Sequence, residues 1–260
     1  MHDGNARRVA VLTGAGRGIG RALAVELGRL GHPVALQSRN PKDLEATAQA
    51  VAEVGGKSIL VPGDVTSKEA ADSLVSRAEA ELGPVWIAVA CAGQALSAPF
   101  LKTEAADLRR LLEVNVVAPF LLLRRAAEAM ISHARGGRLV VVGSTASIKG
   151  MRYTAAYTAS KHAVLGMVRS LALEVAPQKI TANVLCPGWV DTPMFDQTLD
   201  NISQKTGRTR TEARVSIEKT IPTGQVLRPE EVAGLLRYLV SPEAGEVTGQ
   251  AMVIDGGSAL

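Results

Sequence analysis

The stretch that decides the fold is "RVAVLTGAGRGIGRALAVEL", residues 8–27. An apolar, β-branched run is followed by a glycine-rich turn at 13–20 and then by apolar residues at helical spacing. Glycines between a strand and a helix let the backbone approach a ligand, and the helix N-terminus offers unpaired N–H groups to a phosphate. The spacing departs from G-x-G-x-x-G, because Ile19 holds the last position of that pattern. The turn predicts dinucleotide binding chiefly by its place after the first strand.

The same alternation of strand and helix continues along the chain. Parallel strands need crossover connections, and right-handed crossovers cover both faces of a sheet. The sequence therefore predicts an α/β fold with residues 1–260 in one domain: a Rossmann-type doubly wound parallel sheet with helices on both faces. Strand-like runs lie at 8–13, 33–38, 57–62, 85–90, 138–143, 181–186 and 251–254, and segments of helical spacing at 18–30, 42–54, 67–82, 104–134, 154–176 and 229–240.

One polar segment, 191–222, interrupts this alternation between the strand at 181–186 and the helix at 229–240. It is rich in Thr, Arg and Lys. Long insertions in compact domains are often lids over a binding site. We therefore expect a substrate lid at about 191–222.

Composition argues against several classes of function. A chain of 260 residues that is 47% hydrophobic can bury one large core. No apolar run approaches the ~18 residues of a membrane span, and no signal-peptide core follows the N-terminal charges, so we expect a soluble, cytoplasmic protein. Cys91 and Cys186 form no disulfide or metal motif, and we expect two small buried residues and no metal. The net charge of +4 is spread out and aromatic residues make up 3%, which disfavours a nucleic-acid partner.

The end of the second strand indicates which dinucleotide binds. An acidic residue there accepts bonds from the ribose 2′-hydroxyl, whereas an arginine pairs with a 2′-phosphate. The sequence at 37–40 is "QSRN", with Arg39 and no acid, and Arg17 in the glycine turn supplies a second positive charge. The prediction is NADP(H), with NAD(H) as the alternative. After the third strand, Asp64 and Val65 can meet an adenine with a carboxylate and an apolar side chain.

Two tyrosines lie four residues apart, at 153 and 157. Helical spacing places residues i and i+4 on one face, so Tyr157 and Lys161 project together. A phenol has a reference pKa of about 10, and a neighbouring ammonium lowers that pKa by stabilising the phenolate. Tyr157 is then a candidate general acid or base near neutral pH. Tyr153, one turn earlier, has no lysine four residues on, and we expect it to line the substrate site or to pack.

Two further polar residues stand where a site is expected. Ser144 follows the strand at 138–143, and open α/β sheets bind ligands at the carboxyl ends of their strands. Its hydroxyl either holds a substrate carbonyl beside Tyr157 or only turns the chain. Pro119 lies in a helical run and has no N–H for the carbonyl of Asn115, four residues back. Two interpretations follow. The carbonyl of Asn115 is free to bind a water, or Asn115 is only a polar residue that packs at a tolerated kink.

Together these residues resemble the short-chain dehydrogenase/reductase family. The resemblance extends from Thr13 to Gly257, with the motifs in the family's order. One departure is visible: the family often has Asn-Asn-Ala-Gly where this chain has "ACAG" at 90–93, so the support of that asparagine must come from elsewhere. The motifs are "TGAGRGIG" at 13–20, "DV" at 64–65, "AG" at 92–93, Asn115, Ser144, Tyr157-x-x-x-Lys161, "PG" at 187–188 with Thr192, and "TGQAMVIDGG" at 248–257.

The resemblance implies an enzyme with a catalytic tetrad of Asn115, Ser144, Tyr157 and Lys161. In the family pattern Tyr157 gives or takes the proton of the alcohol oxygen, and Ser144 orients and stabilises the substrate oxygen. Lys161 binds the nicotinamide ribose and lowers the pKa of the tyrosine. A water on the carbonyl of Asn115 continues a proton path to solvent, which agrees with the inference from Pro119.

The resemblance also implies contacts with the ligands. Gly188 and Val190 border the nicotinamide, and Thr192 contacts its carboxamide or the phosphate side. Tyr153 and Trp189 are expected at the substrate. The expected cofactor-binding residues are Gly14, Arg17, Gly18, Ile19, Gly20, Ser38, Arg39, Asp64, Val65, Ala92, Gly93, Tyr157, Lys161, Pro187, Gly188, Val190 and Thr192.

Subfamily features indicate a substrate class. The arginines, "YTASKHAVLG" at 157–166 and the segment 228–250 are similar to β-ketoacyl reductases and polyketide ketoreductases. They imply an NADPH-dependent oxidoreductase, a ketoreductase that transfers hydride between nicotinamide and a ketone or secondary alcohol, most plausibly a 3-oxoacyl thioester. "CPGWVDTPM" at 186–194 is also similar to 3-hydroxybutyrate and 3-hydroxyacyl-CoA dehydrogenases. An NAD-dependent secondary alcohol or 3-hydroxy-acid dehydrogenase is the alternative.

Three further expectations concern the surface and a rival function. Arg208 and Arg210 in the lid suit the phosphates of a phosphopantetheine or CoA thioester, or are solvated surface charge. Family members are usually homotetramers paired through the helices at 104–134 and 154–176, and we expect a homotetramer. A non-catalytic nucleotide-sensing protein is the rival class; such proteins typically lack the tyrosine or the lysine, and this chain has both.

Overall fold

The computed structural model of the protein describes residues 8–67 and 69–260. Its centre is a seven-stranded sheet in the order β3-β2-β1-β4-β5-β6-β7, and all neighbouring strands are parallel. The predicted doubly wound parallel sheet is confirmed. Its order reverses between β1 and β4, so the crevice outside their carboxyl ends is the expected ligand site. The strands are β1 (Val9–Thr13), β2 (Val34–Gln37), β3 (Ser58–Leu60), β4 (Val85–Ala90), β5 (Gly137–Val142), β6 (Ile180–Pro187) and β7 (Ala251–Ile254).

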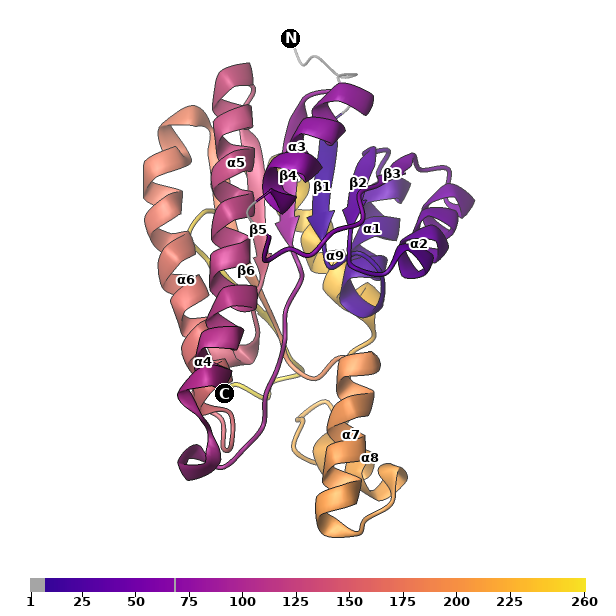
Figure 1. The fold of residues 1–260 in the computed structure, drawn as a ribbon, viewed down its shortest axis with the longest axis vertical. Coiled ribbons are helices and arrows are strands. Elements are labelled where there is room, and N and C mark those ends of the chain that lie inside the picture. Colours follow the sequence, from indigo (N-terminus) through magenta and orange to yellow (C-terminus); the bar gives the residue numbers. More distant parts are fainter. Residues whose placement is uncertain (1–7, 68) are drawn as a thin grey trace.

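Helices cover both faces of the sheet (Figure 1). Val9 and Val11 of β1 belong to the core shared with α3, α5 and α6, whereas Ala10 and Leu12 belong to the core shared with α1, α2 and α9. Burial on both faces explains why the strands read as continuous apolar runs. Of the helices in the described ranges, none has both the length and the apolar character that a membrane crossing requires. These covering helices are α1 (Gly18–Arg29), α2 (Pro41–Glu53), α3 (Ala70–Glu81), α5 (Ala118–His133), α6 (Ala155–Val175) and α9 (Pro229–Val240).

The glycine turn lets α1 begin directly behind β1. A Cβ on Gly20 would collide with the carbonyl oxygen of Gly14, so the closest contact between helix and turn requires glycine. Gly14 and Gly18 have φ values of +69° and +54°, in the left-handed region that side chains disfavour. This geometry brings the N-terminus of α1 to the carboxyl edge of the sheet.

The helical run predicted at 104–134 is present, and it contains a π-helical turn that the sequence analysis did not predict. α4 (Ala105–Leu112) passes into a π-helical turn, Glu113–Val117, before α5 begins. The N–H of Ala118 donates to the carbonyl of Glu113, a bond across five residues. Pro119 lies in the first turn of α5, where its missing N–H is least costly. The π turn places Asn115 at the point where the helical run widens.

The polar segment 191–222 contains two helices that the sequence analysis did not predict. They are α7 (Pro193–Thr206) and α8 (Arg210–Glu218), and they project beyond the carboxyl edge of the sheet (Figure 1). Phe195 and Leu199 of α7 pack on Ala213 and Ile217 of α8 in a small core of their own. Each helix buries only a narrow apolar stripe, which is why the segment reads as polar.

Candidate active site

The glycine turn contacts the loop after β4 at the switch point of the sheet. A Cβ on Gly14 would lie 2.6 Å from the backbone nitrogen of Ala92. On its other side, a Cβ on Gly18 would lie 3.1 Å from Cγ2 of Thr192, which begins α7. The structure thus brings together four residues that the sequence analysis assigned to the cofactor, from segments far apart in the chain.

The N-terminus of α1 is open at this place. α1 begins at Gly18, and the side chain of its N-cap residue, Arg17, makes no capping hydrogen bond. First-turn N–H groups of a helix have no partner within the helix, and the helix dipole favours an anion there. Bare glycine backbone beside uncapped N–H groups therefore fits a dinucleotide phosphate.

Thr47 and Arg21 brace the glycine turn, and the sequence analysis missed both. The fully buried hydroxyl of Thr47 lies 2.9 Å from the carbonyl oxygen of Ala15 and 3.2 Å from that of Gly16. Arg21 donates to the carbonyl of Gly16 at 2.7 Å and to the Thr47 hydroxyl at 3.1 Å. Because N–H and C=O of a peptide unit point in opposite directions, holding these carbonyls towards α2 aims the following N–H groups away from it. Thr47 lies 31 residues beyond Gly16, and no sequence pattern connects them.

The residues expected at the adenosine end share one edge of the sheet. Arg39 follows β2 and Asp64 follows β3, and both side chains are exposed. The backbone N–H and the hydroxyl of Thr66, at 3.0 and 2.8 Å, hold the pKa of Asp64 below its usual value, and the nearby charge of Arg39 adds to this. Among the described residues, neither Arg39 nor Arg17 is in an ion pair, so both guanidinium groups are open to an anion.

Tyr157, Lys161 and Ser144 meet beside this turn. α6 begins at Ala155, so Tyr157 and Lys161 lie on its first turns, with the Lys161 Nζ 5.8 Å from the centre of the Tyr157 ring. Lys161 is buried and donates to the carbonyl of Val142, the last residue of β5, at 2.9 Å. Ser144 follows β5, and its hydroxyl lies near the phenol of Tyr157. The i, i+4 prediction for the tyrosine and lysine is confirmed in geometry.

The expected lowering of the tyrosine pKa was wrong for this structure. Burial raises the pKa of Tyr157, and the hydrogen bond with Ser144 offsets this only in part. Burial also lowers the pKa of Lys161 to about 8. The expectation considered the charge of the lysine and left out the desolvation of the phenol, which dominates here.

Asn115 supports the loop after β4, where this chain has "ACAG" and lacks the asparagine that the family often has. Its side chain is 1% exposed, its Nδ2 donates to the carbonyl of Gln94 at 2.9 Å, and its Oδ1 accepts from the N–H of Gln94 at 2.9 Å. A Cβ on the neighbouring Gly93 would lie 3.3 Å from Oδ1 of Asn115 and 3.6 Å from Nζ of Lys161. The amide of Asn115 thus ties the loop after β4 to the π turn, with Lys161 against both.

The two cysteines are free and lie near Lys161, as small packing residues. Cys186 is buried and Cys91 is half-buried. Burial raises the pKa of the Cys91 thiol to about 12 and also raises that of Cys186, so both stay neutral beside the lysine. Within residues 8–67 and 69–260, no His, Cys, Asp and Glu side chains gather in a group that could hold a metal ion.

Tyr153 lies just before the helix that carries Tyr157, outside the helical segment predicted at 154–176. It precedes α6, has a φ of +65°, and its side chain is 55% exposed. Its carbonyl accepts from the N–H of Ala98 at 2.7 Å, which holds the strained backbone. Trp189, the other residue expected at the substrate, packs on Phe195 at the start of α7 with ring centres 5.7 Å apart.

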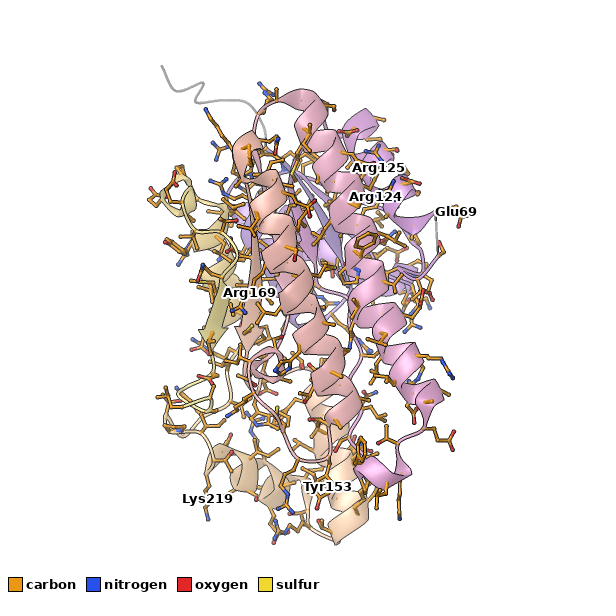
Figure 2. The ribbon with its side chains drawn as sticks, turned by 90° about the vertical axis from the view of Figure 1, so that its left-hand side faces the viewer. Glu69, Arg124, Arg125, Tyr153, Arg169 and Lys219 are labelled. Atoms are coloured by element: carbon orange, nitrogen blue, oxygen red, sulfur yellow. The ribbon has the colours of Figure 1, made fainter. Side chains whose placement is uncertain are left out.

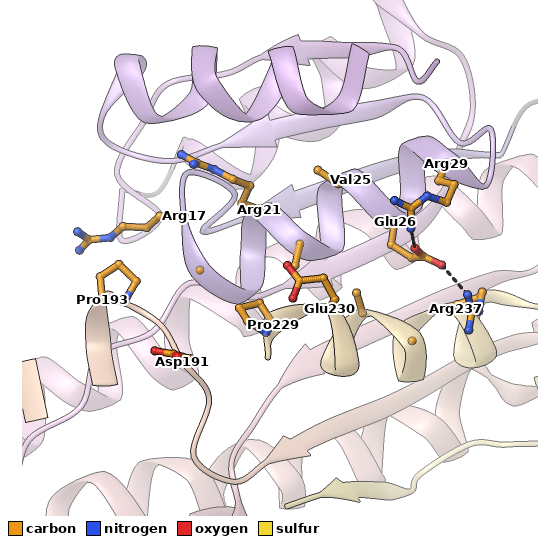
Figure 3. Close-up of a pocket in the computed structure, with 14 residues that line it drawn as sticks. Arg17, Arg21, Val25, Glu26, Arg29, Asp191, Pro193, Pro229, Glu230 and Arg237 are labelled. Carbon is orange, nitrogen blue, oxygen red and sulfur yellow. Dashed lines mark hydrogen bonds and ion pairs between the residues drawn. The ribbon is translucent and has the colours of Figure 1, made fainter. Parts of the chain in front are cut away.

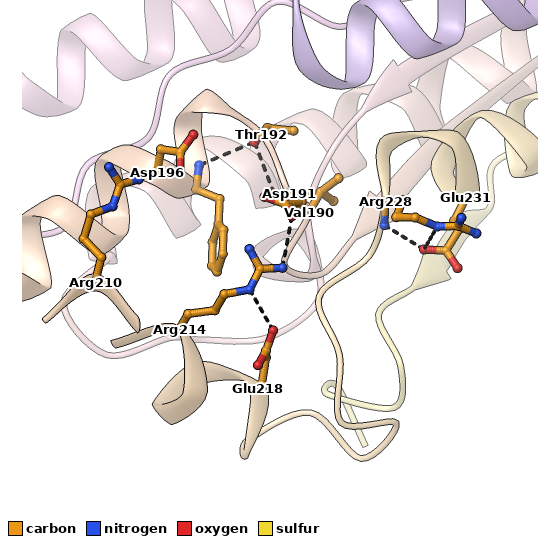
Figure 4. A network of polar contacts seen from close by, with 10 residues as sticks. Val190, Asp191, Thr192, Asp196, Arg210, Arg214, Glu218, Arg228 and Glu231 are labelled. Atoms are coloured by element: carbon orange, nitrogen blue, oxygen red, sulfur yellow. Dashed lines mark hydrogen bonds and ion pairs between the residues drawn. The ribbon is translucent and has the colours of Figure 1, made fainter. Parts of the chain in front are cut away.

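Two cations of the α7–α8 segment, Arg210 and Arg214, are paired with nearby acids (Figure 4). Arg210 pairs with Asp196 at 2.5 Å and with Asp200 at 3.3 Å. Arg214 pairs with Asp191 at 3.0 Å and with Glu218 at 2.9 Å. The expectation that Arg210 meets ligand phosphates is therefore disfavoured, because its guanidinium already has carboxylate partners.

A groove of about 530 Å³ runs between α1 and α9, away from Tyr157 (Figure 3). Arg17 and Arg21 lie at its end near the glycine turn. Glu26 is buried farther along and is bound by Arg29 at 2.9 Å and by Arg237 of α9 at 3.2 Å. This ion-pair cluster joins α1 to α9 behind the glycine turn. Tyr157 is not among the residues of the cluster or of the groove.

This chain is similar to known proteins in sequence and in structure. The family model described as enoyl-(acyl carrier protein) reductase matches residues 14–259. A short-chain dehydrogenase/reductase of Armillaria gallica is 36% identical over 252 residues, covering 96% of this chain and 95% of that protein. The chain belongs to the short-chain dehydrogenase/reductase family. It is therefore an NAD(P)-dependent oxidoreductase that uses a nicotinamide cofactor.

Relatives within the family differ in what they act on. L-2,3-butanediol dehydrogenase of Corynebacterium glutamicum is 32% identical, covering 96% of this chain and 98% of that protein. The crystal structure of a variant of actinorhodin polyketide ketoreductase with NADPH has a TM-score of 0.93 and 33% identity, covering 97% of each chain. Levodione reductase has a TM-score of 0.92 and 26% identity, covering 98% of each chain. Family membership thus determines the reaction class and leaves the substrate open.

We expect Lys161→Met to raise the melting temperature at pH 7 by on the order of 5 °C. The buried ammonium has a backbone carbonyl as its partner, and its lowered pKa of about 8 shows that the fold disfavours the charge. Removing the buried charge should stabilise the folded protein by more than the loss of the hydrogen bond to Val142 destabilises it, which is about 1 kcal/mol.

The pH dependence of this difference tests its cause. Above pH 8 the folded protein releases the proton of Lys161, whereas the unfolded chain keeps it to about pH 10.5, so the wild type gains stability there and the advantage of the variant shrinks. Calorimetry from pH 6 to 10 measures this, with exposed Lys205→Met as the control. A variant that melts below the wild type at pH 7 would contradict the account.

Proposed function

We propose that the protein is an NADPH-dependent ketoreductase that reduces 3-oxoacyl thioesters. The observation that carries this proposal is the placement of Tyr157 near Ser144 and Lys161 at the carboxyl ends of the strands, beside the glycine turn. An acid, an oxygen-binding hydroxyl and a cation at that place suit reduction of a carbonyl group. All four residues of the expected tetrad are present, which disfavours a protein that only senses the nucleotide.

The proposed roles follow from the chemistry of each side chain. A bound reduced nicotinamide supplies a hydride to the carbonyl carbon. Tyr157 gives its phenolic proton to the carbonyl oxygen, which becomes the hydroxyl of the product, while Ser144 donates a hydrogen bond to that oxygen. Burial keeps the phenol protonated at neutral pH, which is the form that reduction consumes. Lys161 binds the nicotinamide ribose and stabilises the phenolate that remains.

Reprotonation of Tyr157 needs a path to solvent. We assign it to Lys161 and a water on the backbone carbonyl of Asn115. Pro119 has no N–H with which to occupy that carbonyl in the ordinary helical pattern. The π turn places Asn115 next to Gly93 and hence next to Lys161.

The cofactor contacts are proposed from the same arrangement. The glycine turn and the N-terminus of α1 take the pyrophosphate, Arg39 and Arg17 take the 2′-phosphate, and Asp64 and Val65 border the adenine. The two exposed guanidinium groups support NADPH over NADH, as does the NADPH-bound structural relative. At the nicotinamide end we place the loop from Pro187 to Thr192.

We propose that the α7–α8 segment, within 191–222, is the substrate lid, with Trp189 and Tyr153 near the substrate. The polyketide ketoreductase relative supports the reduction of a ketone. Of the two lid arginines named for the phosphates of a thioester, Arg208 stays a candidate. The butanediol dehydrogenase relative favours the second candidate function, an NAD-dependent secondary alcohol dehydrogenase. The cytoplasm remains the location predicted from sequence.

The wild-type protein is expected to oxidise NADPH in the presence of acetoacetyl-CoA, and Tyr157→Phe to lower kcat by about 10³-fold with NADPH binding retained. The phenylalanine keeps the ring and removes the acid. Tyr153→Phe is the matched control and should keep most of the rate, because Tyr153 lies outside α6. Equal losses from the two variants would show that the tyrosines are assigned wrongly. A wild type that binds NADPH without turnover would reject the thioester and direct the search to free ketones, cyclic alcohols and polyketides.

Arg39→Asp is expected to weaken NADPH binding by roughly 100-fold and to improve NADH binding. The carboxylate repels a 2′-phosphate and accepts from a ribose hydroxyl. Fluorescence titration with both cofactors measures the two effects, and Arg39→Ala separates loss of the cation from gain of the acid. A wild type that binds NADH more tightly, with little change in Arg39→Asp, would favour the NAD-dependent alternative.

We also propose a homotetramer paired through α5 and α6, whose outer faces are shown in Figure 2. Phe120 of α5 is 49% exposed and Leu173 of α6 is 81% exposed, and an interface over these helices would remove both side chains from water. Light scattering should give the mass of four chains. Phe120→Glu should reduce that mass, whereas Lys205→Glu outside these helices should not, and a monomeric wild type would contradict the proposal.

A further inference from the structure

Ser160 connects the tyrosine segment to the asparagine segment from inside the protein. It lies on α6 between Tyr157 and Lys161, and its side chain is fully buried. Its hydroxyl accepts from Nδ2 of Asn115 at 2.9 Å and donates to the carbonyl oxygen of Tyr157 at 2.7 Å. Asn115 is 45 residues away in the sequence, so this is a tertiary contact.

The direction of every bond in this network is fixed. Both hydrogens of the Asn115 amide are used, one on the carbonyl of Gln94 and one on Ser160, so Ser160 has to accept from Asn115. Its own hydrogen then goes to the Tyr157 carbonyl. A buried network with all members satisfied is rigid, because any displacement leaves a polar group without a partner.

The Ser160 bonds lie close to the start of α6. Thr154, the N-cap residue, makes no capping hydrogen bond with its side chain, and the preceding Tyr153 holds a strained φ of +65°. Tyr157 lies on the first turn that follows. The Ser160 hydroxyl thus donates a hydrogen bond to the carbonyl of Tyr157 from the buried side of the helix.

We propose that Ser160 is a positioning residue for the proton transfer by Tyr157. It holds the first turns of α6, with Tyr157 and Lys161, in register with Asn115 and the loop after β4. Ser160 itself touches neither substrate nor cofactor and acts through the residues it holds. The inference rests on the proposed function, because it assigns Tyr157 as the acid.

The test compares Ser160→Ala with Ser170→Ala, an exposed serine on the same helix. Ser160→Ala is expected to lower kcat for NADPH-dependent ketone reduction about tenfold, because small misplacements of a reacting group cost large factors in rate. KM and the Kd of NADPH should change less than about twofold, since neither ligand contacts Ser160. Ser170→Ala should leave all three unchanged. Ser160→Ala with the kcat of the wild type would overturn the inference.

A double-mutant cycle separates positioning from general loss of stability. If Ser160 acts through Asn115, the effects on kcat of Ser160→Ala and Asn115→Ala will combine to less than their product. The pH above which kcat falls should also move down in Ser160→Ala, because a looser α6 exposes the half-buried phenol to more water and lets its raised pKa fall. Multiplicative effects with an unchanged pH profile would reduce Ser160 to a stability residue.

A readout without turnover distinguishes failure of this inference from failure of the proposed function. Tyrosinate absorbance near 295 nm, with the titration of the Tyr157→Phe variant subtracted, reports the pKa of Tyr157 alone. Ser160→Ala should lower this pKa even if no ketone proves to be a substrate. An unchanged Tyr157 titration would reject the inference, whatever the substrate assays show.

Discussion

A parallel sheet has to be buried on both faces, and this constraint places the active site. Each crossover helix returns the chain to the starting edge, so all seven strands end at the same edge. The order reverses between β1 and β4, and the loops after these strands diverge around the crevice. Gly14 touches Ala92 across it, and Gly20 lets α1 start close behind. The nucleotide turn and the tyrosine helix meet there because the sheet admits no other edge for ligands.

The buried ammonium of Lys161 is the electrostatic feature of that crevice. Val142 gives it one backbone acceptor, and the nearby thiols of Cys91 and Cys186 stay neutral because burial raises their pKa values. A charge held this way costs stability, and the lowered pKa of the ammonium expresses the same cost. Proteins keep such groups where chemistry needs them, so stability and the proposed function oppose each other at this residue.

Satisfied polar side chains hold the loops that a sheet alone does not fix. The Thr47 hydroxyl lies within hydrogen-bond distance of two carbonyls of the glycine turn, and Asn115 holds both backbone groups of Gln94. These bonds are buried and geometrically specific. The ion pairs of Arg210 and Arg214 in the α7–α8 segment are more exposed and contribute less per contact. The glycine turn is therefore held firmly, and the α7–α8 segment is held more weakly. This combination suits a site that binds one cofactor and admits variable substrates.

The sequence by itself determined the alternating elements, the parallel sheet and the pairing of Tyr157 with Lys161. These follow from apolar periodicity and from helical spacing, which are local rules. Only the tertiary structure decided the π turn at Asn115, the braces at Thr47 and Ser160, the strained Tyr153 and the raised pKa of Tyr157. Each depends on groups brought together from distant parts of the chain or on the removal of water from a side chain. Desolvation and long-range hydrogen bonding have no period in a sequence, because they exist only once the chain has packed.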